Sequence, residues 1–456
     1  MADRVEDAAF EKDTIINNNF NTLHTPIHRL GPRNNSLLNK QVKKRTTQSN
    51  VNDNNDRSNK PTTMSSTTTT ETSTDASYPS FESFIKHDEI EQKIAASKNV
   101  PIPIVLSPPS TLGDNMKNAF DASTFILKYK KQIDKLIQDN GIIIFRNFPL
   151  QTSEDFNIFV SKSFPNWDDL SYEKSMSFAV RTKLSDRICT TNEGKSGGLV
   201  FHHEQAQTPL WPSYVFFCCE LPANKGDGGE TGIVSSNLVY KELKKRYPKF
   251  IQNCELHGVQ YTVYAGPTQD PSKGAGRSWK SFFHVSTKEE CESKMKNGGW
   301  TYEWGIGSDG KYQSNNPDIL KCTTPKLDAV KLVDGKKCFF NQLIATTANA
   351  LEFSNVGKNG GGYNPLVDIP TQEGIDACVK FSNGESLDLD ILLDAKQICE
   401  NLSINIHWKQ GDVALISNYL YMHARRLWNG EEGTRKLLAS LVAEHNCTSF
   451  NQPLIV

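Results

Sequence analysis

Residues 201–206 read FHHEQA, and they give the strongest single clue to the architecture of this chain. Successive side chains of a β-strand alternate between its two faces, so a strand here would direct His202 and Glu204 to one face and His203 to the other. Such a pair can bind a metal ion. A His-x-Glu pair also occurs by chance in solvated loops and hydrogen-bonded cores, so the assignment depends on a third ligand.

A candidate third ligand, His423, lies far along the chain in residues 411–435, after a predicted turn and strand. Two histidines and one carboxylate form the facial triad that binds non-haem Fe(II) in oxygenases and leaves positions open for co-substrates. We therefore predict a metal site formed by His202, Glu204 and His423. The same ligand set also suits Zn²⁺, so a redox-inert zinc protein is an alternative.

An arginine follows His423 within the same segment. Asn429 and Gly430 are a turn signal, and a hairpin about Asn429 would make His423 and Arg435 face the same side. A guanidinium binds a carboxylate through two parallel hydrogen bonds. We therefore predict that Arg435 is a carboxylate clamp beside the metal, although arginines are mostly exposed. The hydroxyl of Thr231, which closes a Gly-rich turn, can also donate to a carboxylate.

Composition limits the class of protein. Residues 1–90 are rich in Asn, Thr and Ser, which predicts a disordered, low-complexity N-terminal tail. Residues 91–456 are predicted to form one catalytic domain with a large core. The formal net charge is −1, so neither nucleic acid nor an anionic membrane surface is expected as a partner. The expected partner is a small-molecule substrate, and the sequence gives no indication of the oligomeric state.

The cysteines and the apolar runs bear on localisation. All ten cysteines lie at or after Cys189 and none forms a Cys-x-x-Cys pair, which favours reduced, buried thiols over a zinc ribbon or a disulfide framework. No apolar run reaches the length of a membrane span, and residues 1–13 are acidic without a hydrophobic stretch. We therefore expect a cytoplasmic protein without a signal peptide.

Local patterns predict several helices and strands. A helix at 121–140 ends at Gly141, and a buried strand follows it. Further helices are predicted at 152–164 and from 235 to about 246. Strands are predicted at 101–106, 142–145, 213–219, 336–341, 413–417 and 437–442, the last two as neighbours in a barrel. With helices mainly towards the N-terminal side, this mixture predicts an α+β, mainly β protein built on a jelly roll with flanking helices.

The sequence resembles the clavaminate synthase-like branch of the TauD/TfdA family of dioxygenases. The resemblance covers about residues 100–445 and rests on motifs that occur in the same order as in the family. These motifs are GIIIFRNFP at 141–149, FHHEQA at 201–206, PSYVFFCCE at 212–220, GGETGIVSS at 228–236, RSWK at 277–280, FNQ at 340–342 and GDVALISN at 411–418.

The resemblance implies a double-stranded β-helix, Fe(II) as the metal, and 2-oxoglutarate and O₂ as co-substrates. It implies that His202, Glu204 and His423 bind the iron, and that Arg435 and Thr231 bind 2-oxoglutarate. The chain has Glu204 where many relatives have aspartate. It also has insertions near 305–320 and 355–395, which bear on the substrate pocket.

The expected reaction is hydroxylation of a small polar metabolite with release of succinate and CO₂, and desaturation or cyclisation remain open. Asn192, Asn341 and Arg277 are the predicted substrate-binding residues. Trp279 and Lys280 are further candidates for the pocket, with core and surface positions as the alternative. A non-catalytic binding or regulatory protein on the same scaffold is the competing function, and such a protein would be expected to lack a triad residue or the arginine.

Overall fold

The computed structural model describes residues 80–86, 89–109, 116–191, 198–270, 276–307, 310–354, 364 and 366–444. The chain divides into Met1–Thr74 and Asp75–Val456, and all described residues belong to the second unit. Most of the predicted tail therefore lies outside the described residues. From Ser80 on, the chain forms the short 3-10 helix η1 (Phe81–Phe84), whose Phe84 is fully buried, so the folded unit begins before residue 91.

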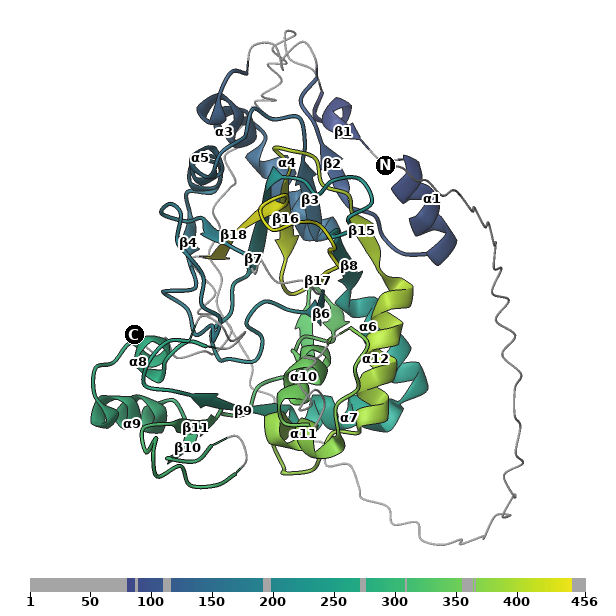
Figure 1. Cartoon of the computed structure of the whole chain (residues 1–456). Helices are drawn as coiled ribbons and strands as arrows, with labels where there is room; N and C mark the ends of the chain where they lie inside the picture. The colour runs from purple at the N-terminus through teal and green to yellow at the C-terminus, as the bar shows by residue number, and fades with distance from the viewer. Residues whose placement is uncertain are drawn as a thin grey trace, which may run out of the picture. The chain divides into compact units, whose positions relative to one another are not determined.

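The larger sheet has eight strands in the order β1-β2-β3-β16-β7-β18-β4, with β5 paired to β18 (Figure 1). All neighbours are antiparallel except β2 and β3. The strands are β1 (Ile85–Lys86), β2 (Ile104–Leu106), β3 (Ile142–Phe145), β4 (Trp167–Asp169), β5 (Cys189–Thr190), β7 (Tyr214–Leu221), β16 (Val413–Ser417) and β18 (Lys436–Glu444).

Helices cover one face of this sheet. α3 (Ala119–Lys128), α4 (Lys130–Asn140) and α5 (Ser153–Ser163) contribute to a core cluster that includes Phe145, Phe156 and Phe216. The helix ends follow the predicted signals. Thr152 caps α5 through a capping box, and Gly141 ends α4 in the left-handed conformation at φ 77°, which glycine adopts without strain.

The second sheet has the order β15-β8-β17-β6, with all neighbours antiparallel. Its strands are β6 (Leu199–His202), β8 (Thr231–Ser235), β15 (Ile404–Ile406) and β17 (Tyr421–Arg425). Ile233 and Tyr421 pack in one cluster with Val215 and Phe217 of the larger sheet. The two sheets therefore face each other across a shared apolar layer, which is where a buried site can form.

The other face of the second sheet packs against helices. Val234 and Met422 belong to a core cluster that these helices share. The helices are α6 (Ser236–Arg246), α7 (Pro248–His257), α10 (Leu343–Asn349), α11 (Gln372–Cys378) and α12 (Leu389–Leu402). Alternate side chains of β17 thus point either to this helical layer or to the larger sheet, as the pleat of a strand requires.

The remaining elements lie mainly in the middle of the chain. A third sheet has the order β10-β11-β9-β14, and β12 pairs with β13. The strands are β9 (Val259–Ala265), β10 (Thr301–Trp304), β11 (Leu320–Thr323), β12 (Lys331–Val333), β13 (Lys336–Cys338) and β14 (Val379–Phe381). The helices are α1 (Glu89–Lys98), α8 (Trp279–Phe283), α9 (Lys288–Asn297) and the 3-10 helix η2 (Ala350–Glu352).

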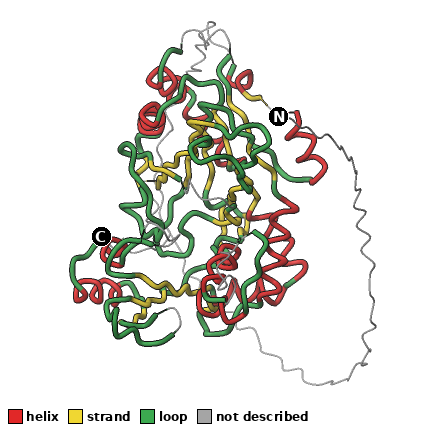
Figure 2. The backbone as a smooth tube through the Cα atoms, viewed as in Figure 1, coloured by secondary structure: helices red, strands yellow, loops and turns green. Residues whose placement is uncertain are grey.

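Three predictions about these elements were wrong. The helix expected at 121–140 is two helices, because Tyr129 leaves the helical conformation (φ −106°, ψ 20°) and packs its ring against Phe84 and Phe125. β16 and β18 share a sheet but are separated by β7. Helices occur throughout the described chain and not mainly towards its N-terminal side, as the colour by residue number in Figure 1 and the red helices of Figure 2 show together.

The hairpin expected about Asn429 does not form. β17 pairs with β8 and β6 in the second sheet, whereas β18 pairs with β7, β4 and β5 in the larger sheet. The segment between these two strands therefore connects two sheets. His423 lies in a strand of the second sheet and Arg435 directly precedes a strand of the larger sheet, so hairpin parity does not relate the two side chains.

The cysteine prediction was confirmed for the described residues, where nine cysteines are free and buried. Cys447 lies outside that part of the chain. In the same described ranges, no helix combines the length and apolar character that are needed to cross a membrane.

Candidate metal centre

The structure brings His202, Glu204 and His423 together, with one ligand atom of each within 4.8 Å of the others. His202 ends β6 and pairs directly with His423 of β17, and their ring centroids are 4.3 Å apart. Oε2 of Glu204 lies 3.8 Å from Nε2 of His202 and 3.6 Å from Nε2 of His423. The Phe217 ring of the larger sheet lies 5.0 Å from the His423 ring, so the three residues lie between the two sheets.

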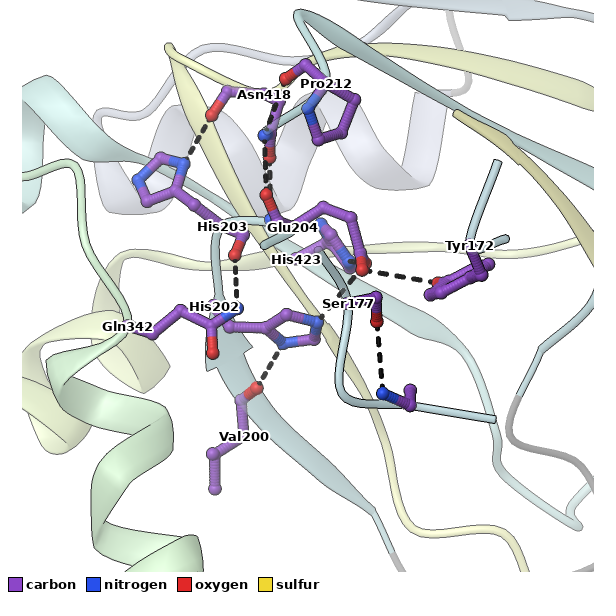
Figure 3. Close-up of polar contacts among 11 residues, drawn as sticks. Tyr172, Ser177, Val200, His202, His203, Glu204, Pro212, Gln342, Asn418 and His423 are labelled. Atoms are coloured by element: carbon purple, nitrogen blue, oxygen red, sulfur yellow. Dashed lines mark hydrogen bonds and ion pairs between the residues drawn. The ribbon is translucent and has the colours of Figure 1, made fainter. Parts of the chain in front are cut away.

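Glu204 is not part of the strand that was predicted to carry it. β6 ends at His202, and the chain then turns, with Gln205 in the left-handed region at φ 58°. The side chain of Asn418 holds this turn, because its Oδ1 accepts from the Glu204 N–H at 2.8 Å and its Nδ2 donates to the Glu204 carbonyl at 3.0 Å (Figure 3). The carboxylate is therefore positioned by a turn and a buried amide, and not by strand alternation.

Replacing Asn418 with alanine is expected to disturb both folding and metal binding. Asn418 is fully buried and also donates to the Pro212 carbonyl at 2.9 Å, so its loss leaves one N–H and two carbonyls without this partner. We expect the free energy of unfolding in urea to fall by about 2–3 kcal/mol. We expect Fe(II) affinity to fall by about 10- to 100-fold, as for other residues that support metal ligands.

Asn140→Ala is the matched control for this change, because the Asn140 amide donates to the Leu136 carbonyl at the end of a partly exposed helix. Its effect on the free energy of unfolding should stay within about 0.5 kcal/mol. Similar losses of stability and iron affinity in the two variants would contradict a special role for Asn418.

His203 points away from the other three side chains, as predicted. Its Nδ1 donates to the Asn418 carbonyl (Figure 3). Its Nε2 accepts from the Ser236 hydroxyl at 2.9 Å. Burial lowers the pKa of His203 to about 3, so the ring is neutral at pH 7. His203 is therefore a structural residue that links the Glu204 turn to α6.

The histidine rings are oriented for a metal ion. Nδ1 of His202 donates to the Val200 carbonyl at 2.9 Å, which leaves the lone pair on Nε2, the nitrogen that faces Glu204. Nδ1 of His423 is buried and has no hydrogen-bond partner in the described part of the chain. A buried ring whose polar neighbour is one carboxylate fits a metal site better than a hydrogen-bonded core.

The protonation states also suit metal binding. Burial alone would raise the pKa of the Glu204 carboxyl, but contacts with His202 and His423 outweigh burial and hold that pKa well below its ordinary value. Burial lowers the pKa of His423 to about 4. At neutral pH, Glu204 is therefore ionised and His423 is neutral, and these are the forms in which both residues bind metals.

Tyr172 is a neighbour of the triad that the sequence did not suggest. Its hydroxyl donates to Oε1 of Glu204 at 3.3 Å, and its ring is buried (Figure 3). Burial raises the pKa of Tyr172 well above its ordinary value, so the phenol remains a donor. Tyr172 lies thirty positions before His202 outside any strand or helix, and no local pattern distinguishes it from other tyrosines.

Thr231 lies on the strand that pairs with His423, and Arg435 is held by the turn just before Thr231. Thr231 and Ile233 point to the same face of β8, and Ile233 pairs with His423. Thr231 therefore lies two positions along the strand from the residue that pairs with His423, on the same face. Trp408 donates to the Thr231 hydroxyl at 3.0 Å, which leaves the hydroxyl hydrogen available as a donor. Arg435 directly precedes β18, is 4% exposed, and donates through Nε to the Gly229 carbonyl at 3.0 Å.

Gly229 makes room for this arginine. Its φ is 79°, and a Cβ on this residue would lie 2.9 Å from Nε of Arg435. A larger residue would therefore both strain the turn and displace the guanidinium. The Gly-rich turn that leads into β8 thus holds Arg435 through the Gly229 carbonyl.

The predicted substrate residues have other surroundings. The buried Arg277 donates to the backbone carbonyls of five residues: Tyr172, Glu173, Ser175, Ser177 and Ser281. The amide of Asn341 donates to the Ala329 carbonyl and accepts from the Leu343 N–H. Trp279 is a core residue at 2% exposure. Asn192 lies outside the described residues.

Comparisons with known proteins identify the family to which the chain belongs. Residues 110–295 match the family described as taurine catabolism dioxygenase TauD, TfdA family. A clavaminate synthase-like protein of Arabidopsis thaliana is 32% identical over 355 residues, which cover 77% of this chain and 96% of the relative. The dapdiamide synthesis protein DdaC of Enterobacter agglomerans is 21% identical over 327 residues, which cover 69% of this chain and 87% of the relative.

Solved structures include an asparagine oxygenase in complex with Fe(II), 3-hydroxyasparagine and succinate. It is 8% identical, covers 75% of this chain and 93% of its own chain, and superposes with a TM-score of 0.39. The sequence matches, the mixed α/β fold and the His-Glu-His cluster define the class of this protein as an oxygenase. The chain belongs to the TauD/TfdA family, among its clavaminate synthase-like proteins, and members of this family use Fe(II) and 2-oxoglutarate.

Proposed function

We propose that this protein is an Fe(II)- and 2-oxoglutarate-dependent dioxygenase that oxidises a small polar metabolite. The observation that carries the proposal is the cluster of the partly buried His202 and Glu204 with the buried His423. Thr231 lies on the strand that pairs with His423, and the Gly229 carbonyl just before Thr231 accepts from the buried Arg435. A zinc protein would have no use for a buried guanidinium and a threonine hydroxyl beside the metal. A carboxylate-bearing co-substrate has a use for both.

We further propose that the two facing sheets form a double-stranded β-helix. In support, both sheets are antiparallel apart from the β2–β3 pair, and Phe217 of their shared apolar layer lies against His423 of the triad. Consecutive strands β6, β7 and β8 alternate between the sheets, as do β16, β17 and β18. This alternation is the connectivity that a jelly roll requires.

The residues present fit an iron ion. Two imidazoles and one carboxylate lie together, and this is the donor set that suits non-haem Fe(II) with open positions. His202, Glu204 and His423 would hold the metal. When bound, Fe(II) would supply the redox chemistry that couples oxidative decarboxylation of 2-oxoglutarate, with release of succinate and CO₂, to oxidation of the substrate.

The chain's own residues bind and orient the reactants. Arg435 and Thr231 would bind the far carboxylate of 2-oxoglutarate and fix its position relative to the triad. Phe217 and the apolar layer between the sheets would exclude water from this region. Tyr172 would hold the carboxylate of Glu204 in one orientation.

Hydroxylation is the proposed outcome, and desaturation and cyclisation are the other outcomes open to this chemistry. A small polar substrate is consistent with the similarity to a dapdiamide synthesis protein. Asn192 remains a proposed substrate-side residue. Arg277 and Asn341 would act on the substrate indirectly, through the backbone segments that their side chains hold.

An anaerobic titration tests the proposal without knowledge of the substrate. Purified protein is titrated with Fe(II) and then with 2-oxoglutarate while visible absorption is recorded. We expect a charge-transfer band that needs both additions. Iron binding without a band on addition of 2-oxoglutarate would overturn the co-substrate assignment, and absence of iron binding would favour a non-catalytic function.

Arg435→Ala is expected to weaken 2-oxoglutarate binding by about 10- to 100-fold, because one charge-assisted contact is lost. Arg435→Lys should recover part of the affinity, since a lysine retains the charge but not the paired donors. The measurement is the 2-oxoglutarate concentration that gives half of the band in the iron-loaded protein. Arg246→Ala removes a partly exposed arginine whose partners are Glu242 and Asp394, and it should change this value less than twofold.

A further inference from the structure

A second arginine lies close to the triad and has no role in the function proposed above. The guanidinium carbon of Arg181 lies 5.2 Å from the centre of the Tyr172 ring, and the Tyr172 hydroxyl contacts Glu204. Burial raises the pKa of the Cys189 thiol, the charge of Arg181 lowers it and the charge of Glu204 raises it, so both charges lie near this thiol. Arg181 thus lies on the Tyr172 side of the metal centre.

Most donors of Arg181 have no partner among the described residues. Its Nη1 donates to the Val180 carbonyl at 2.9 Å, and its Nε is buried without a hydrogen-bond partner in the described part of the chain. Within those ranges, no carboxylate lies at ion-pair distance from Arg181. A buried guanidinium donor without a partner carries a desolvation cost, so the arrangement calls for an anionic group that is supplied from outside the chain.

The segment that carries Arg181 is held on both sides. On one side, the buried Arg277 donates to the carbonyls of Tyr172, Glu173, Ser175 and Ser177 at 2.7–3.1 Å. On the other side, at the base of a small loop, the Thr190 N–H donates to the Thr182 carbonyl at 2.9 Å and the Thr182 N–H donates to the Thr190 hydroxyl at 3.0 Å. The backbone on both sides of Arg181 is therefore held before any ligand arrives, which lowers the entropy cost of binding.

The two arginines differ in a way that separates their roles. Arg277 donates its N–H groups to backbone carbonyls and is a positioning residue for the 172–177 segment. Arg181 keeps donors available beside the triad. We propose that Arg181 binds an anionic group of the primary substrate, in the first instance a carboxylate, so that the substrate class is a small carboxylate-bearing metabolite. This inference rests on the proposed function, because it takes the triad as the reacting centre.

Simple carboxylates and their amides provide a direct test. Acetate with acetamide, and glycine with glycinamide, are added to the anaerobic protein loaded with Fe(II) and saturating 2-oxoglutarate, so that the Arg435 site is filled. We expect the carboxylates, at concentrations up to about 100 mM, to perturb the charge-transfer band, and the amides to do so much less. In Arg181→Gln the apparent carboxylate affinity should fall by about 10- to 100-fold.

Two further variants control for charge and for folding. Lys183→Gln removes an exposed positive charge two residues away and should respond like the wild type. Arg181→Lys should retain part of the response. A thermal-shift measurement on metal-free protein with the same compounds gives a second readout, in which carboxylates should raise the Tm of Lys183→Gln more than that of Arg181→Gln.

The outcomes separate this inference from the proposed function. If the wild type forms the band but no carboxylate perturbs it, or if Arg181→Gln responds like Lys183→Gln, the inference is overturned and the oxygenase proposal stands. If the wild type forms no band, the oxygenase proposal fails, and the thermal shifts alone decide whether Arg181 binds carboxylates. Equal responses to the carboxylate and the amide would also overturn the inference.

Discussion

Replacing Glu204 with alanine is expected to abolish iron-dependent turnover while leaving the fold intact. The variant removes the one anionic donor from the cluster, and both histidine Nε2 atoms lose their carboxylate neighbour. Loss of a residue that merely supports a metal ligand costs about 10- to 100-fold, so loss of a ligand should reduce Fe(II) affinity and 2-oxoglutarate turnover by more than about 100-fold. Succinate formation and the anaerobic charge-transfer band measure the two effects.

The fold should tolerate this change for a specific reason. Asn418 binds the N–H and the carbonyl of Glu204, and both groups remain in alanine. The turn after β6 therefore keeps its support, and the Tm should change by only a few degrees. Glu154→Ala, which removes an exposed carboxylate from the first turn of α5, is the control and should retain full turnover. Wild-type activity in Glu204→Ala would contradict the ligand assignment.

Sequence patterns predicted those features of the fold that depend on neighbouring residues. The capping box at Thr152 and the left-handed Gly141 involve contacts within a few positions, so the helix ends could be located. The strand at 142–145 was equally clear, because four consecutive apolar residues are buried on both faces of the larger sheet. The residues that form the His-Glu-His cluster were also predicted, since a metal requires particular ligand types.

Features that depend on distant contacts could not be predicted in this way. The Tyr129 break in the N-terminal helix is caused by packing against Phe84, which precedes it by more than forty residues. The Asn429 turn signals suggested a hairpin, yet β17 and β18 each find better partners in different sheets. Glu204 and Asn418 are also far apart in the sequence, so the periodicity of local side chains cannot predict the hydrogen bonds between them.

Replacing Asp412 with alanine is expected to lower the free energy of unfolding by about 3–5 kcal/mol. Asp412 is fully buried at the start of β16, and Arg146 at the end of β3 contacts it through two nitrogens at 2.7–3.2 Å. The same carboxylate accepts from the Lys409 N–H at 2.9 Å. Its removal leaves a guanidinium buried without its counter-ion, and that desolvation cost dominates the loss. Urea unfolding at pH 7 measures it.

Two controls separate this effect from charge removal in general. Asp139→Ala breaks the exposed pair with Lys135, whose side chains are 52% and 75% exposed, and should cost less than about 1 kcal/mol. The double change Asp412→Leu with Arg146→Met removes both charges at once and should recover much of the loss, because no unpaired charge stays buried. A loss as small as that of Asp139→Ala would mean that water reaches Arg146 in the variant. The Arg146–Asp412 pair joins β3 to β16, two central strands of the sheet that covers the metal centre. β16 pairs in turn with β7, which carries Phe217 beside His423. The buried pair therefore supports the register that positions Phe217, whereas the Lys135–Asp139 pair lies on an exposed helix surface.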